Sequence, residues 1–168
     1  INALKAVWHR GAVDADGKTG DGAGIHLEIP SDFFAEKIEL TGHDHDGSEI
    51  CVGMIFLPRN NYQAQENART LVESELTKSN FSIYGWRQVP VNPKVLGEKA
   101  NLTRPEITQV LFKHNNKDLT EKELERKIYE SRRKIEKEAI KNAIEGFYIC
   151  SLSSKSVIYK GMFLAESI

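Results

Sequence analysis

The apolar positions of the chain follow two spacings, one typical of helices and one typical of strands. Apolar residues that recur three or four positions apart predict long helices at 1–10, 61–78 and 120–141. Shorter apolar runs bounded by turn residues predict strands at 25–29, 50–58, 81–91, 106–114, 146–153 and 156–163. Strands with interspersed helices indicate a layered α+β architecture, and no repeat or linker divides the 168 residues.

Helix-start signals occur at two further places. A short helix is predicted at 30–38, where Ser31 or Asp32 can cap its first turn. The adjacent phenylalanines of that segment, Phe33 and Phe34, are expected to supply its buried face. The last long helix begins with Thr120 followed by Glu123, which has the form of a capping box.

Two of the strand predictions also indicate how the strands are arranged in a sheet. The run at 50–58 is continuously apolar and rich in residues that fit a pleated sheet, so an inner strand is expected there. The runs at 146–153 and 156–163 are separated only by a Ser/Lys turn, and this arrangement predicts a hairpin.

Charge and composition narrow the class of protein. Lys and Arg total 23 against 24 Asp and Glu, a formal charge of −1, so no field over the whole chain favours nucleic acid or an anionic membrane. The basic side chains of 120–141 alternate with glutamates and predict a solvated helix face. No apolar run is long enough to span a bilayer and the first residues lack the order of a signal peptide, so a cytoplasmic location is expected.

Cysteine and histidine usage predicts no metal site. Cys51 and Cys150 lie in apolar strand-like runs without CxxC spacing, and they are expected to be buried free thiols. His43 and His45 alternate with aspartates in a Gly-flanked turn, which raises the possibility of metal binding. Neighbouring polar side chains in such a turn usually face solvent and lack a third fixed ligand, so no metal is predicted there.

A glycine-rich segment from Gly11 to Gly24 stands out from the rest of the sequence. Its Gly17-Lys18-Thr19 matches the tail of a phosphate-binding loop, but that pattern requires glycine where this chain has Ala12. The predicted order of elements, helix then loop then strand, is also the reverse of a phosphate-binding loop. A second interpretation, that the glycines only permit tight turning, requires no ligand.

Several segments give this loop a third interpretation, because they occur in the same order in one known family. They are HRGAVDADGKTGDGAG, IPSDFF, VGMIFLP, IYGWRQVPVN, LGEKA, RPEITQ, RRKIEK and FYICSLSSKSVIYKGMF. The chain thereby resembles the glutamate synthase large subunit, in the bacterial NADPH-dependent type, across nearly its whole length. The HRG element of that family belongs to a class II glutamine amidotransferase domain, a four-layer αββα sandwich of the N-terminal-nucleophile hydrolase type.

The resemblance implies a defined chemistry. A thiolate at the first mature residue attacks the glutamine amide, its own α-amino group serves as the base, and a thioester forms and is hydrolysed. The resemblance places Arg10 beside that nucleophile, where a guanidinium can brace the catalytic loop. On physical grounds alone Arg10 could instead complement a helix end, and His9 is expected to be a structural hydrogen bonder.

The same resemblance implies that residues 1–168 form an incomplete glutaminase domain, truncated at both ends. Ile1 carries no thiol, and the oxyanion-hole Asn-Gly pair of the family would fall after Ile168. This fragment alone is therefore expected to be inactive and to hold no cofactor.

Cofactors and partners are implied for the parent enzyme only. They are FMN and a 3Fe-4S cluster on other domains of the large subunit, and FAD, 4Fe-4S clusters and NADPH through a small flavoprotein subunit. Glutamine is the implied substrate of this domain, and its ammonia is passed to 2-oxoglutarate. Ferredoxin as electron donor, another class II amidotransferase and a non-catalytic scaffold are the alternatives.

Overall fold

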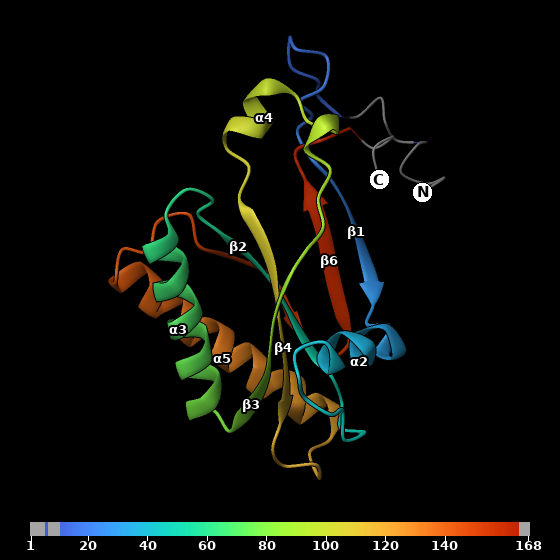
Figure 1. Cartoon of the computed structure of the whole chain (residues 1–168), viewed down its shortest axis with the longest axis vertical. Coiled ribbons are helices and arrows are strands. Elements are labelled where there is room, and N and C mark those ends of the chain that lie inside the picture. The colour runs from blue at the N-terminus through green and yellow to red at the C-terminus, as the bar shows by residue number, and fades with distance from the viewer. Residues whose placement is uncertain (1–5, 7–10, 165–168) are drawn as a thin grey trace. The chain divides into compact units, whose positions relative to one another are not determined.

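The computed structural model describes residue 6 and residues 11–164 and forms two compact units (Figure 1). The larger unit comprises 27–89 and 105–157, and the smaller one comprises the described residues outside those ranges. Strands assemble into a four-stranded sheet and a two-stranded sheet, with helices between them in sequence. The predicted α+β class is confirmed, and the helix predicted at 1–10 lies outside the described residues except for Ala6.

The four-stranded sheet of the larger unit has the order β3-β4-β2-β5. Its strands are β2 (Cys51–Leu57), β3 (Phe81–Gln88), β4 (Glu106–His114) and β5 (Tyr148–Ser153). β2 pairs antiparallel with both β4 and β5, so the prediction of an inner strand is confirmed. Its residues are almost all buried because both faces of the strand are covered.

Two long helices, α3 (Tyr62–Lys78) and α5 (Glu121–Lys141), pack side by side on this sheet (Figure 1). Their buried apolar side chains recur four or seven positions apart and join the strands in one core. Within this core the rings of Phe81 and Phe112 meet edge to face, with centroids 5.3 Å apart. The capping box of α5 is confirmed, because Thr120 and Glu123 each bond the other's backbone N–H.

Helix α2 (Ser31–Glu39) corrects two details of the sequence analysis. Pro30 occupies the N-cap position and no side chain caps the helix, so the predicted caps at Ser31 and Asp32 are wrong. Phe34 is fully buried with Ile38, whereas Phe33 is 37% exposed. Adjacent helical residues point about 100° apart, so only one of the two phenylalanines can face the core.

The predicted hairpin at 146–163 is wrong. β5 belongs to the four-stranded sheet, whereas β6 (Ser156–Gly161) pairs with β1 (Ala23–Glu28) in the two-stranded sheet. The turn between β5 and β6 is held by Glu125 of α5, whose carboxylate accepts hydrogen bonds from the Ser153 hydroxyl and from the Ser154 N–H and hydroxyl. A contact from a distant helix therefore redirects the chain, which local turn chemistry could not reveal.

The smaller unit contains short elements that the apolar pattern missed. They are a 3-10 turn, η2 (Pro93–Val95), and a one-turn helix, α4 (Glu98–Leu102). Such short helices bury too few apolar side chains to produce a periodic signal. In α4 only Ala100 is buried.

The surface of α5 carries the predicted charge pairs. Arg126 bonds Glu130 at 2.9 Å and Arg132 bonds Glu136 at 2.8 Å, both one turn apart. No helix in the described part of the chain has both the length and the apolar character that crossing a membrane requires.

Candidate active site

The glycine-rich segment folds into a tight loop in the smaller unit. Val13 and Gly20 form an antiparallel bridge, and the N–H of Asp14 donates to the Thr19 carbonyl at 2.9 Å. Gly17 sits at the turn with φ +68°, a conformation that glycine adopts without a steric penalty. The N–H of Asp21 donates to the Ala12 carbonyl at 3.2 Å and closes the loop near its beginning.

The carboxylate of Asp16 holds the tip of this loop. Its Oδ1 accepts the N–H groups of Lys18 and Thr19 at 2.9 and 2.7 Å, and its Oδ2 accepts the Thr19 hydroxyl at 2.5 Å. Hydrogen bonds from the Thr19 hydroxyl and then from backbone N–H groups lower the pKa of Asp16 to about 2. The carboxylate is therefore charged at neutral pH.

This arrangement also decides against the phosphate-loop interpretation. A phosphate-binding loop needs its backbone N–H groups directed at the ligand. Here the N–H groups of Lys18 and Thr19 are directed at the Asp16 carboxylate. A phosphate at the tip of this loop would meet the negative Asp16 carboxylate and not unpaired N–H donors.

The remaining glycines let the loop lie against the segment at β6. A Cβ on Gly20 would lie 2.8 Å from the Phe163 carbonyl oxygen, and one on Gly24 would lie 2.8 Å from that of Tyr159. Gly22 adopts φ +126° beside Gly161. The glycine content of the loop therefore follows from close backbone approach.

A second segment, at the start of α4, touches the loop tip. A Cβ on Gly97 would lie 2.2 Å from both Asp16 Oδ2 and Thr19 Oγ1, so no other residue fits there without displacing them. The N–H of Glu98 donates to the Asp16 carboxylate, and the Lys99 ammonium lies 2.7 Å from Asp14 Oδ2. Gly97 and Lys99 were not predicted from the sequence as site residues, because only the fold brings together positions as far apart as Asp14 and Lys99, which are separated by 85 residues.

The other residues singled out from the sequence have separate positions. Arg10 and His9 lie outside the described residues. His45 Nε2 lies 2.8 Å from the Ser48 carbonyl, and Asp46 is paired with Lys113 at 2.7 Å and Lys117 at 3.2 Å. The described residues contain no cluster of three groups suited to a metal ion.

The two cysteines are buried free thiols, as predicted. Burial, and then the nearby charges of Glu49 and Glu125, raise the pKa of Cys51 well above its usual range. A thiol needs to ionise near neutral pH to act as a nucleophile. Cys51 is therefore a packing residue of the core.

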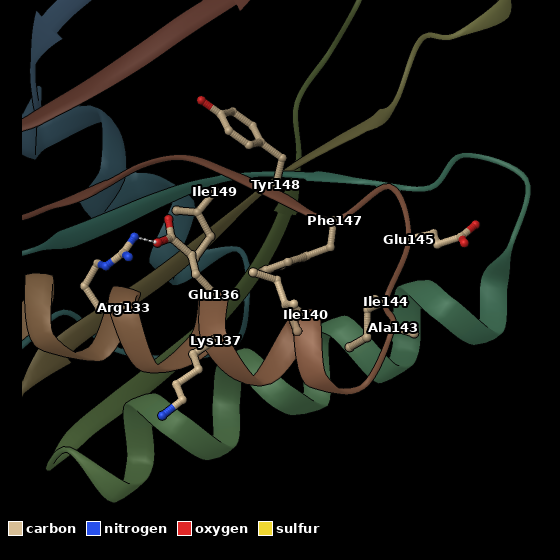
Figure 2. A pocket seen from close by; sticks show the side chains of 11 residues that line it. Arg133, Glu136, Lys137, Ile140, Ala143, Ile144, Glu145, Phe147, Tyr148 and Ile149 are labelled. Carbon is tan, nitrogen blue, oxygen red and sulfur yellow. Dashed lines mark hydrogen bonds and ion pairs between the residues drawn. The ribbon is translucent and has the colours of Figure 1, made fainter.

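Two hollows in the larger unit were not predicted from the sequence. One, of about 650 Å³, lies between the end of α5 and the start of β5, and Figure 2 shows its lining with the Arg133–Glu136 ion pair. The other, of about 470 Å³, lies beside Trp86, whose indole N–H donates to Glu73 at 2.6 Å. Neither is lined by a cysteine, so neither offers the thiol that the resemblance requires.

Comparison with known families matches all of residues 1–168 to the glutamine amidotransferases class-II. The chain belongs to this family of N-terminal-nucleophile hydrolases. Its relatives include a glutamate synthase large chain and ferredoxin-dependent glutamate synthases, so the resemblance stated from the sequence is confirmed.

The identities differ between the two types of relative. The chain is 54% identical over its whole length to the "Glutamate synthase [NADPH] large chain" of Azospirillum brasilense, of which it covers 11%. It is 39% identical to the ferredoxin-dependent glutamate synthase 1 of Arabidopsis thaliana, with 99% of this chain and 10% of the relative covered. For the ferredoxin-dependent glutamate synthase 2 of Synechocystis sp. the identity is 37%, with 96% and 10% covered. The chain thus spans about a tenth of the length of these relatives.

Proposed function

We propose that this chain is part of the glutaminase domain of a glutamate synthase, and that the whole enzyme passes ammonia from glutamine to 2-oxoglutarate for reduction to glutamate. The observation that carries the proposal is the family match over all 168 residues together with 54% identity to a glutamate synthase large chain. The HRG element and the glycine-rich loop after it lie inside the matched range.

The proposed chemistry divides between this chain and residues outside it. In this proposal the nucleophile is the thiol of the N-terminal cysteine that the family resemblance implies. Neither Cys51 nor Cys150 serves, because both are buried in the larger unit. A thiolate attacks the glutamine amide, ammonia leaves, and water hydrolyses the thioester. Arg10 is the residue of this chain assigned to that site, where its guanidinium braces the catalytic loop. Residues 1–168 alone are then an inactive, partial domain.

The cofactors and partners of the proposed enzyme lie elsewhere. FMN and a 3Fe-4S cluster belong to other domains of the large subunit, and FAD, 4Fe-4S clusters and NADPH are contributed through a small flavoprotein subunit. NADPH is proposed as the electron source because the identity is higher to the NADPH-dependent relative than to the ferredoxin-dependent ones. The same difference supports a cytoplasmic location over the chloroplast named for some relatives.

The test is an Arg10→Ala variant of the full-length gene product. Glutamine hydrolysis and glutamine-dependent glutamate synthesis should fall on the order of 10²-fold, because a misplaced catalytic loop loses the reactive geometry. Synthesis from added ammonia should stay at the wild-type rate, since it bypasses the glutaminase site. Steady-state assays with each nitrogen donor measure both.

A matched control removes another arginine from the same protein. Arg126 projects from α5 with 79% of its side chain exposed, so Arg126→Ala should leave both activities unchanged. Full glutaminase activity in Arg10→Ala would remove Arg10 from the site. A full-length product without an N-terminal cysteine and without glutaminase activity would favour the scaffold.

A further inference from the structure

The start of α4 lies against the tip of the glycine-rich loop, although the two are distant in the sequence. Gly97 leaves no room for a side chain, because a Cβ there would be 2.2 Å from the Asp16 carboxylate and the Thr19 hydroxyl and 2.5 Å from the Thr19 backbone nitrogen. Real Cβ atoms do not approach other atoms so closely. Any side chain at position 97 therefore displaces the loop tip.

Polar contacts tie the two segments together at this point. The Asp16 carboxylate accepts the N–H of Glu98, the first residue of α4, whose N-cap Gly97 has no side chain to offer. Thr19 is only 5% exposed, and its hydroxyl completes the contact by donating to Asp16. The Lys99–Asp14 ion pair, at 2.7 Å, also joins the two segments.

Backbone hydrogen bonds join the tip of the glycine-rich loop to its beginning. Asp14 and Thr19 are paired through the backbone, and so are Ala12 and Asp21. Ala12 comes directly after Gly11, the first residue of the glycine-rich loop. A displacement of the loop tip therefore strains the hydrogen bonds that close the loop at its beginning.

We propose that Asp16, Thr19 and Gly97 form a latch that positions the glycine-rich loop for the glutaminase reaction. This inference rests on the proposed function. The three are positioning residues, because they act through the loop and touch no substrate. The latch makes the segment at 97–99 part of the glutaminase site, although it carries no catalytic group.

The test compares two substitutions at Thr19 in the full-length gene product. Thr19→Val keeps the shape of the side chain and removes the hydroxyl, so kcat/KM for glutamine should fall roughly tenfold, the ratio expected for one lost hydrogen bond. Thr19→Ser keeps the hydroxyl and should stay within about twofold of the wild type. Ammonia-dependent glutamate synthesis should be equal in both variants, which a general loss of folding would not allow.

Gly97→Ala provides a second and stronger perturbation of the latch. Glutamine-dependent turnover should fall on the order of 10²-fold with ammonia-dependent synthesis retained. Lys94→Ala, at an exposed position of the same segment, is the matched control and should behave as the wild type.

Each outcome separates the latch from the proposed function. A wild-type protein without glutamine-dependent activity would refute the proposed function itself. With an active wild type, equal kinetics for Thr19→Val and Thr19→Ser would overturn the latch. A parallel loss of glutamine- and ammonia-dependent activity in Thr19→Val would also overturn it, because the hydroxyl would then serve only folding.

Discussion

The two compact units are stabilised by different interactions. The larger unit buries a continuous apolar core between one sheet and two helices, with members such as Phe81, Phe112 and Ile128 almost fully inaccessible. In the smaller unit, glycines lie against neighbouring backbone atoms. Hydrogen bonds to Asp16 and an ion pair between Lys99 and Asp14 hold the loop in place. Apolar burial is non-directional, whereas polar contacts fix geometry.

This difference shows where each kind of substitution should act. Stability should depend mainly on the larger unit, because buried aromatic and aliphatic side chains contribute the most free energy per residue. The position of the glycine-rich loop should depend on polar contacts within the smaller unit. Each of these contacts contributes little to stability, but together they fix the geometry of the loop. Three predictions test this contrast, in order of decreasing effect.

The largest loss of stability is expected for Phe112→Ala in the larger unit. Phe112 is fully buried and its ring contacts Phe81, so removing it should cost about 3–5 kcal/mol of unfolding free energy. Denaturant-induced unfolding measures this change. Tyr129→Ala removes an aromatic side chain that is 61% exposed and should cost about 0.5 kcal/mol or less. Equal losses for the two variants would contradict the contrast.

An intermediate effect is expected where glycines permit close approach. A Cβ on Gly53 of β2 would meet the ends of the Leu152 and Val110 side chains at 2.6 Å, whereas one on Gly24 would meet the Tyr159 carbonyl oxygen at 2.8 Å. Either substitution by alanine should cost about 1–3 kcal/mol of unfolding free energy.

A double-mutant cycle separates these two glycines. Val110→Ala makes room beside position 53, so the pair should show a favourable coupling of about 0.5–3 kcal/mol. Lys160→Ala leaves the backbone beside Gly24 in place, so that pair should show none. Coupling at both sites would mean that the backbone beside Gly24 accommodates an added Cβ as readily as the side chains beside Gly53, and would contradict the contrast.

The smallest effect is expected from the charge of Asp16. Its pKa is lowered from 3.8 to about 2 in the folded protein, so its contribution to stability is fully present above about pH 4 and is lost as the pH falls through about 2. Asp16→Asn should remove this part of the pH dependence of denaturant midpoints between pH 5 and pH 2. Asp118→Asn, at an exposed position of the larger unit, is the control and should retain it.

The sequence predicted an element correctly where the spacing of its apolar residues reflects which face of the element is buried. The bounds of α3, β4 and α5 agree with their apolar patterns to within one residue, because each element buries one face or both faces against the sheet. It failed where a distant contact decided the outcome. The β5–β6 turn is held by hydrogen bonds to Glu125 of α5, and the start of α4 lies where Gly97 contacts the loop.

The sequence by itself determined the secondary structure of the larger unit, the buried state of Cys51 and Cys150, and the family to which the chain belongs. The spacing of apolar residues and the order of motifs suffice to predict these three properties, because both are features of the local sequence. The tertiary structure decided that β6 pairs with β1 and that the Asp16 carboxylate occupies the N–H groups a phosphate would need. It also decided that Gly97 touches the loop, because such contacts join positions that local sequence does not relate.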